Sequence, residues 1–218
     1  MGVQVEAVVF DLDGVITDTA HYHYRAWKKL ADELNIYFDE AINERLKGVD
    51  RLSCLDIILE RAAKQYTEQE KNLLANRKNE YYKQLIKTMP SSDILPGALD
   101  VLKALKERGI KTGLASVSKN AFTVVEKLDI KAYFDYIVDA KTIKRSKPDP
   151  EIFLTAAERL NVHPEKCIGV EDAEAGVQAI KAAGMYAVGV GDPSNLHEAD
   201  DVIQGLEAFD IDKYMDVF

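Results

Sequence analysis

The sequence of 218 residues predicts an α/β fold, with a Rossmann-like parallel sheet as its core and a helical cap domain inserted after the first strand. From residue 96 onward, short apolar runs alternate with helix-period segments, which indicates βαβ units covered on both faces. Between about residues 18 and 92 the pattern is helical, with little strand signal. We therefore expect a core domain of residues 1–17 and 93–218 and a cap domain of residues 18–92.

The first strand and the insertion have clear local signals. Ala7–Phe10 is an apolar run that predicts a buried strand. Within the insertion, Thr67 and Glu70 have the spacing of a capping box, in which the two residues satisfy free N–H groups at the start of a helix. The chain is expected to return to the core through Ser91–Gly97, where a Pro and a Gly mark a turn.

The remaining core elements alternate along the chain. We expect strands at Gly113–Ala115, Tyr136–Val138 and Cys167–Val170, and a closing strand at Ala187–Val190. The expected helices alternate with these strands: the first covers Ala98–Glu107 and is stopped by Gly109, and the second covers Asn120–Leu128. A third helix ends at about Leu160, and an alanine-rich fourth ends near Gly184. Asp149 is expected to cap the helix that ends near Leu160, with Pro150 at its first position.

Composition and charge exclude several classes of protein. With 47% hydrophobic and 30% charged residues, the chain is typical of a soluble globular protein and is neither disordered nor a disulfide scaffold. It has neither a membrane-spanning run nor a secretory signal pattern, so we expect a cytoplasmic protein with Cys54 and Cys167 reduced. A net charge of −9 disfavours nucleic-acid and anionic-membrane partners, because either needs a basic face.

Four groups of polar residues lie at the carboxyl ends of predicted strands or in the loops that come after these strands. They are Asp11–Gly14, Ser116, Lys147 and Glu171–Asp172. Ligands of an open parallel sheet bind beyond the carboxyl ends of its strands. Taken singly, each group is a weak signal, because a carboxylate at a strand end is more often a helix cap and a lone Ser is more often structural. Their order and spacing along one chain favour a functional site.

The acidic groups indicate phosphoryl transfer. Asp11, Glu171 and Asp172 would place three carboxylates near one point, where each like-charge pair at about 4 Å costs about 4 kcal/mol at an effective dielectric of about 20. A hard cation such as Mg²⁺ would offset this repulsion. Lys147 and Ser116 would supply a positive charge and a hydrogen-bond donor to the oxygens of a transferring phosphoryl group.

Two of the aspartates suit distinct catalytic roles. Asp11 can attack phosphorus and form an aspartyl-phosphate. Asp13 lies two residues further on and can face the same cavity without bonding the metal through its side chain. Asp13 is therefore the candidate general acid and base for the alcohol oxygen.

This combination resembles a known family. The motif positions are Phe10–Gly14 with Thr19, Ser116, Lys147 and Glu171–Asp172. They resemble the four motifs of the haloacid dehalogenase (HAD) superfamily, whose small-molecule phosphotransferases carry a helical cap. A more specific resemblance, to the phosphohexose mutases of that superfamily, rests on His23, Lys47–Arg51 and Ser118–Asn120.

The resemblance implies an activity and a set of site residues. The implied reaction interconverts β-D-glucose 1-phosphate and D-glucose 6-phosphate through β-D-glucose 1,6-bisphosphate, with Mg²⁺ and a phospho-aspartyl enzyme. The implied metal ligands are the side chains of Asp11, Glu171 and Asp172 and the backbone carbonyl of Asp13. The implied substrate-binding positions are Thr19, His23, Trp27, Lys47, Gly48, Arg51, Lys78, Ser118, Lys119 and Asn120. Among these, Arg51 and Ser118–Asn120 match positions that hold the phosphate that is not transferred.

Several of these positions also have an ordinary structural interpretation. His23 alone could be a polar position on a cap helix, and Trp27 fits the cap core better than a sugar platform. Arg77 and Lys78 would ordinarily form a solvated helix face. The remaining histidines have no motif around them and are expected at the surface: His21, His163 and His197.

Three functions therefore compete: a phosphohexose mutase, a sugar-phosphate hydrolase of the same superfamily, and a non-enzymatic metal-dependent binding protein. A mutase must bind a phosphate at each end of its intermediate, and Lys47, Arg51, Ser118 and Lys119 offer a second anion site, which favours the mutase. The binding protein would need a damaged core motif, and all core residues are present. We expect small-molecule sugar phosphates as the ligands and a monomeric protein.

Overall fold

The computed structural model describes residues 4–46 and 51–215 of the chain. The chain divides into two compact units. The core unit consists of Met1–Asp18 and Pro90–Phe218, and the cap unit of Thr19–Met89. Each unit has its own hydrophobic cluster and is described by itself.

The core unit is built on a six-stranded sheet in the order β3-β2-β1-β4-β5-β6, and each pairing is parallel. The strands are β1 (Ala7–Phe10), β2 (Lys111–Leu114), β3 (Tyr136–Ile137), β4 (Cys167–Glu171), β5 (Tyr186–Val190) and β6 (Asp201–Ile203). All residues of β1 and β4 are buried, as expected for strands covered on both faces. The predicted parallel α/β core is confirmed. Its strand order reverses between β1 and β4, and such a switch point is where sheets of this kind bind ligands.

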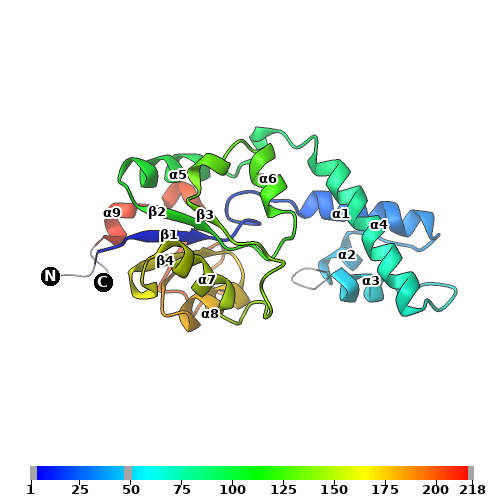
Figure 1. Ribbon diagram of the computed structural model, residues 1–218. Helices are drawn as coiled ribbons and strands as arrows, with labels where there is room; N and C mark the ends of the chain where they lie inside the picture. The colour runs from blue at the N-terminus through cyan, green and yellow to red at the C-terminus, as the bar shows by residue number, and fades with distance from the viewer. Residues whose placement is uncertain (1–3, 47–50, 216–218) are drawn as a thin grey trace. The chain divides into compact units, whose positions relative to one another are not determined.

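Helices cover both faces of the sheet, with α7 and α8 on one side and α5 on the other (Figure 1). The core helices are α5 (Ala98–Glu107), α6 (Ala121–Lys127), α7 (Glu151–Leu160), α8 (Glu174–Ala182) and α9 (Ile211–Tyr214). Side chains alternate across β1, so Ala7 and Val9 join the apolar cluster with α7 and α8. Phe10 packs instead near Phe209, with the two ring centroids 6.4 Å apart.

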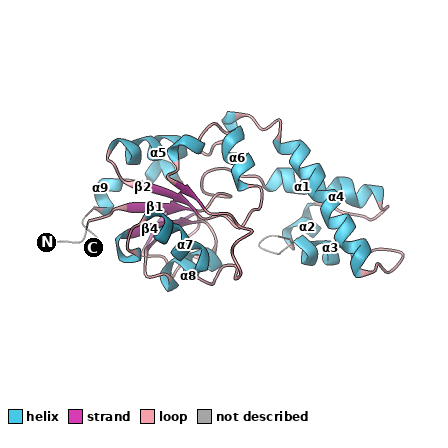
Figure 2. Cartoon of the chain, viewed as in Figure 1, coloured by secondary structure: helices cyan, strands magenta, loops and turns pink. Residues whose placement is uncertain are grey.

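Over the described residues of the cap unit, the regular secondary structure consists of helices joined by loops (Figure 2). Its helices are α1 (Ala20–Glu33), α2 (Glu40–Glu44), α3 (Arg51–Leu59) and α4 (Glu68–Ile86). The expected capping box is present, since Thr67 Oγ1 accepts the Glu70 N–H at 3.2 Å and the Glu70 carboxylate accepts the Thr67 N–H at 2.8 Å. Across the described part of the chain, no helix combines the length and the apolar character that a membrane crossing requires.

The two segments that lead into and out of the insertion run side by side within the core unit. Thr17 forms an isolated antiparallel bridge with Ile94, and Thr17 Oγ1 donates to the Asp93 carbonyl at 2.6 Å. The Leu95 N–H donates to the Ile16 carbonyl at 2.9 Å. Hydrogen bonds therefore tie the outgoing and returning segments to each other.

Two expectations about the core elements are wrong. The strand series does not close at Val190, because β6 pairs with β5 at the edge of the sheet. β6 has three residues and begins with Asp201, so it offers no apolar run for the pattern to reveal. Helix α7 begins at Glu151 and not at Pro150, although the Asp149 carboxylate accepts the Glu151 N–H at 3.0 Å and so caps this end.

Both cysteines are free thiols, and both are buried. Cys54 lies in the hydrophobic cluster of the cap unit, and Cys167 in that of the core unit. Burial raises the pKa of the Cys167 thiol to about 12, so this residue behaves as a small apolar side chain and not as a nucleophile.

Candidate active site

Three carboxylates meet where the sheet reverses its strand order. Asp11 directly follows β1, Glu171 is the last residue of β4, and Asp172 follows it. Phe10 is in register with Val170, so the carboxyl ends of the two strands lie at the same level. As a result, ligand oxygens of the three acidic side chains all lie within 4.8 Å of one another.

Lys147 reaches this cluster from the loop between β3 and α7. Its Nζ donates to Asp11 Oδ1 at 2.6 Å and to Glu171 Oε2 at 2.7 Å. The side chain is 11% exposed, and its Nζ lies 5.1 Å from the centroid of the Phe153 ring. When all four groups are ionised, three carboxylates and one ammonium leave two negative charges uncompensated.

Burial raises the pKa of every carboxyl group in the cluster. Burial and the charge of Glu171 raise the pKa of Asp11 to about 7, and the opposing effect of Lys147 is smaller. Burial also raises the pKa of Glu171, while burial and the charge of Asp11 raise that of Asp172 to about 6, although Asp172 keeps contact with solvent. Burial would lower the pKa of Lys147, but the charges of Asp11 and Glu171 outweigh it and raise that pKa.

These donors fit a hard divalent cation. All three side chains offer carboxylate oxygens, which Mg²⁺ prefers, and their raised pKa values reflect burial first and, for Asp11 and Asp172, a deficit of positive charge among the carboxylates. A bound cation would remove that deficit and return the carboxylates to their ionised forms.

Two glycines make room for the acidic side chains. Gly14 has φ +81°, in the left-handed region, and a Cβ at this position would overlap the Asp172 carboxylate. Gly176 lies in the first turn of α8, where a Cβ would overlap the Glu171 carboxylate. Gly176 was not predicted from the sequence, although a glycine inside an otherwise regular helix pattern is a recognisable signal of close packing.

The loop after β2 carries the other predicted polar residues of the core unit. Ser116 is buried, and its Oγ accepts the Ser118 N–H at 3.1 Å. Ser118 Oγ in turn accepts the Asn120 N–H at 3.3 Å, and Asn120 occupies the N-cap position of α6 without a side-chain capping bond. Lys119 is exposed. Because β2 pairs with β1, this loop begins beside Asp11 on the same edge of the sheet.

The cap unit contains a separate group of basic residues. Lys78 is 3% exposed, and its Nζ donates to His23 Nδ1 at 2.8 Å and lies 4.5 Å from the Trp27 ring centroid. Burial and the charge of Arg51 lower the pKa of Lys78 to about 7. Burial and the charges of Lys78 and Arg51 lower the pKa of His23 to about 3, so the imidazole is neutral and its Nδ1 accepts. The two cationic groups, Lys78 and Arg51, therefore repel one another, and a bound anion would relieve this repulsion.

The structure places the other predicted cap residues as follows. Thr19 is fully buried at the start of α1, and its carbonyl accepts the N–H groups of Tyr22 and His23. Trp27 is 3% exposed within the cap core, as its structural interpretation expects. Lys47 and Gly48 lie outside the described residues.

The expectation of a solvated helix face is wrong for Lys78 and correct for Arg77, whose side chain is 53% exposed. Tyr82 was also not predicted from the sequence, and its ring stacks on His23 with centroids 4.0 Å apart. Tyr82 follows Lys78 by four residues on α4, and this spacing places both on one face of the helix, which was the available signal.

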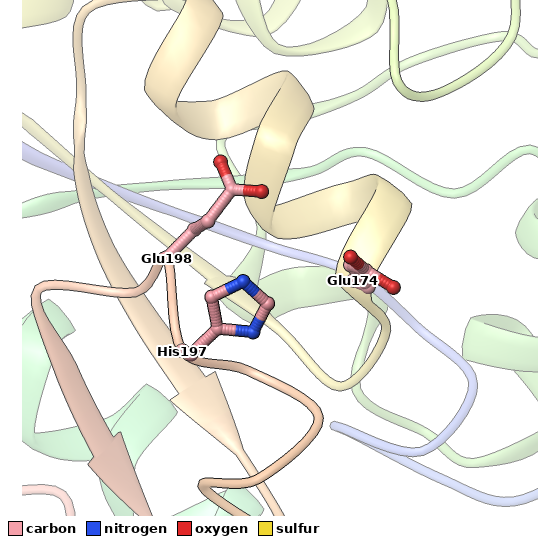
Figure 3. A group of neighbouring side chains, drawn as sticks. All are labelled: Glu174, His197 and Glu198. Carbon is pink, nitrogen blue, oxygen red and sulfur yellow. The ribbon is translucent and has the colours of Figure 1, made fainter.

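A second group of possible metal ligands lies on the surface of the core unit. Glu174, His197 and Glu198 point toward a common region (Figure 3), with one ligand atom of each within 4.8 Å of the others. All three are exposed, as expected for His197, and Gln178 Nε2 donates to Glu198 at 2.8 Å. Water can solvate these charges, so among the described residues the buried group is the stronger candidate for a cation site. His21 and His163 are also exposed, as expected.

Comparisons with known proteins identify the family of this chain. Residues 5–184 match the family model described as a hydrolase, haloacid dehalogenase-like. The chain is 50% identical over 202 residues to a β-phosphoglucomutase of Bacillus subtilis, covering 92% of this chain and 89% of the relative. It is 35% identical over 187 residues to a phosphorylated carbohydrates phosphatase of Thermotoga maritima, with 84% of each chain covered. A crystal structure of β-phosphoglucomutase from Clostridium difficile superposes with a TM-score of 0.86 at 48% identity, covering 96% of this chain and 95% of that one.

Proposed function

Because this chain belongs to the haloacid dehalogenase-like hydrolase family and is an enzyme of that superfamily, we propose that it acts as a β-phosphoglucomutase. In this proposal it interconverts β-D-glucose 1-phosphate and D-glucose 6-phosphate through β-D-glucose 1,6-bisphosphate. The observation that carries the proposal is the basic group around Lys78 in the cap unit, which is separate from the acidic site at the sheet. A phosphatase needs to hold one phosphate, whereas a mutase must also hold the phosphate that does not react.

In the proposed mechanism, Asp11 is the nucleophile. One of its carboxylate oxygens attacks the phosphorus of a sugar phosphate, the bond from phosphorus to the sugar oxygen breaks, and an aspartyl-phosphate forms. Lys147, which already bonds Asp11 and Glu171, orients the attacking carboxylate and adds positive charge beside the transferring group. Ser116, at the carboxyl end of the neighbouring strand, would donate a hydrogen bond to a phosphoryl oxygen.

Asp11, Glu171 and Asp172, with the backbone carbonyl of Asp13, would hold Mg²⁺. When bound, this ion supplies positive charge that neutralises the carboxylates and the phosphoryl oxygens. Asp13 would give a proton to the sugar oxygen as that bond breaks, and it would take a proton from the sugar hydroxyl that attacks the aspartyl-phosphate in the second half-reaction.

The phosphate that does not react would bind to basic and hydroxyl groups. Arg51 is the main candidate in the cap unit, because its planar guanidinium can donate to two phosphate oxygens at once. In the core unit, Ser118, Lys119 and Asn120 are the corresponding candidates. We further propose that the enzyme is a monomer whose ligands are free sugar phosphates, with neither nucleic acid nor a membrane as partner.

A ³¹P NMR experiment tests the proposal. Purified protein is incubated with β-D-glucose 1-phosphate, Mg²⁺ and a trace of the 1,6-bisphosphate, and a parallel sample contains EDTA. The mutase predicts conversion to glucose 6-phosphate with Mg²⁺ and none with EDTA. Release of inorganic phosphate as the main product would instead show the hydrolase, which the phosphatase relative makes the competing function.

A further inference from the structure

We propose that Glu151 is a positioning residue for Lys147: it fixes the loop that carries this lysine to the start of α7. This inference rests on the proposed function only in taking Lys147 as part of the phosphoryl-transfer site. Glu151 is the first residue of α7 and lies four residues after Lys147. None of its contacts is with the acidic cluster itself, so it would act through the loop.

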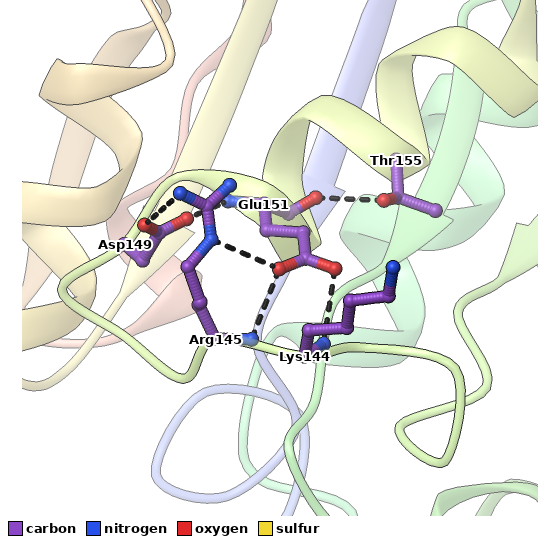
Figure 4. Close-up of polar contacts among 5 residues, drawn as sticks. All are labelled: Lys144, Arg145, Asp149, Glu151 and Thr155. Carbon is purple, nitrogen blue, oxygen red and sulfur yellow. Dashed lines mark hydrogen bonds and ion pairs between the residues drawn. The ribbon is translucent and has the colours of Figure 1, made fainter.

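The Glu151 carboxylate holds two successive backbone N–H groups of that loop (Figure 4). Its Oε1 accepts the Lys144 N–H at 3.0 Å, and its Oε2 accepts the Arg145 N–H at 2.9 Å. Arg145 Nε also approaches Oε2 at 3.4 Å. The Glu151 side chain is 20% exposed, and the bond from the Lys144 N–H is the main reason that its pKa lies below the usual range. The carboxylate is therefore ionised at neutral pH.

The part of the loop next to α7, which contains Asp149, is also hydrogen-bonded to the start of this helix. Asp149 Oδ1 accepts the Glu151 N–H at 3.0 Å, and Asp149 Oδ2 pairs with the Arg145 guanidinium at 3.2 Å. The Asp149 N–H donates to the Ser146 carbonyl at 3.0 Å. These bonds fix the backbone on both sides of Lys147, whose own side chain extends away to Asp11 and Glu171.

Helix α7 is a rigid support for this arrangement. Ile152 and Phe153, directly after Glu151, are fully buried in the core cluster, and Thr155 Oγ1 donates to the Glu151 carbonyl at 2.7 Å. The Phe153 ring also lies next to the Lys147 ammonium. One helix thus holds both the loop backbone and the side chain of the lysine, and displacing a catalytic group by about 1 Å can cost up to about 100-fold in rate.

A double-mutant cycle with Lys147 separates positioning from a general structural role. The measured quantity is the rate at which acetyl phosphate phosphorylates the protein with Mg²⁺, followed by intact mass spectrometry. A mutase and a phosphatase share this step, so the cycle measures the contribution of Lys147 to phosphorylation in either case. The ³¹P NMR experiment tests the proposed mutase function independently. We expect Glu151→Ala to slow phosphorylation by roughly 10- to 100-fold. In the Lys147→Ala background, the same change should slow it by less than about twofold.

Glu151→Gln keeps one accepting oxygen and should give an intermediate rate; it replaces Glu151→Ala in the cycle if the alanine variant does not fold. The matched control is Glu158→Ala, an exposed position on the same helix, which should leave the rate unchanged. Equal slowing by the Glu151 change with and without Lys147, or no slowing in the parent protein, would overturn the positioning role.

Discussion

At the scale of single residues, Asp13 differs from Asp11 in what its side chain is expected to do. We expect Asp13→Asn to slow turnover by roughly 10²- to 10⁴-fold, the usual contribution of general acid–base catalysis, because an amide cannot transfer the proton. Metal affinity should change little, since the proposed ligand is a backbone carbonyl. Steady-state kinetics and Mg²⁺ titration measure the two effects. Asp11→Asn is the comparison, because it should abolish the phosphoenzyme itself, and turnover of Asp13→Asn near the parent rate would exclude the proton-transfer role.

Lys78 gives a pH dependence whose sign follows from its burial. Its pKa falls from 10.5 to about 7 on folding, so between these values the unfolded chain holds a proton that the folded chain does not. The free energy of unfolding should therefore rise as pH increases from about 7 to about 10.5, and the buried charge is most costly below pH 7.

Lys78→Met should remove this rise and increase the melting temperature at pH 7, because a similar volume is buried without the charge. Thermal unfolding across the pH series measures both effects. Lys83→Met, with a side chain 44% exposed on the same helix, is the control and should retain the pH dependence of the parent protein. An unchanged dependence in Lys78→Met would mean that folding does not lower the pKa of this lysine, because its ammonium stays solvated.

At the scale of secondary-structure elements, replacing Gly176 with alanine has two opposing effects on the free energy of unfolding, one from helix propensity and one from packing. Replacing a helical glycine with alanine ordinarily stabilises a helix by up to about 1 kcal/mol. At Gly176 the new methyl group would overlap Glu171, and overpacking of this kind costs about 1–3 kcal/mol. We expect Gly176→Ala to lower the free energy of unfolding and to slow phosphoenzyme formation.

Urea unfolding and the acetyl phosphate assay measure the two consequences of Gly176→Ala. Gly205→Ala is the control, because a methyl group there would meet no atom within 4 Å. A Gly176→Ala protein that is more stable and equally active would show that Glu171 has space to move.

The elements that the sequence could predict are those with a strong local pattern. β1 and β4 are continuous apolar runs, and Asp11 and Glu171 lie at their ends, so pattern and topology together bring these residues to one place. β6 carries no such pattern, because it is held by pairing with β5 and not by its own apolar content. The burial of Lys78 could not be predicted from the sequence either, since it depends on which face of α4 packs against α1.

At the scale of the whole molecule, the two units divide the proposed work, which gives a test of their roles. Arg51→Ala should depress mutase turnover by roughly 100-fold, because hydrogen bonds to charged groups contribute about 1.5–3 kcal/mol each. It should leave the slow hydrolysis of acetyl phosphate nearly unchanged, since that donor carries no second phosphate. Arg51→Lys should recover part of the loss.

Both activities of the Arg51 variants can be measured on one preparation. The matched control is Arg61→Ala, with a side chain 40% exposed in the same unit, which should affect neither activity. A parallel fall in both activities of Arg51→Ala would show that Arg51 supports folding or the acidic site.

The antiparallel bridge between Thr17 and Ile94 makes the insertion a side branch of the chain, meaning a segment that leaves the core and returns to it at the same place. The outgoing and returning segments leave the core at one point, so the branch can be lengthened, shortened or exchanged without altering the order of the six strands. Substrate preference can then diverge among descendants of one ancestor through changes in this branch, while the strand ends that carry the phosphoryl-transfer chemistry are inherited intact. A mutase and phosphatases of different substrates among the relatives are the outcome that such a modular architecture allows.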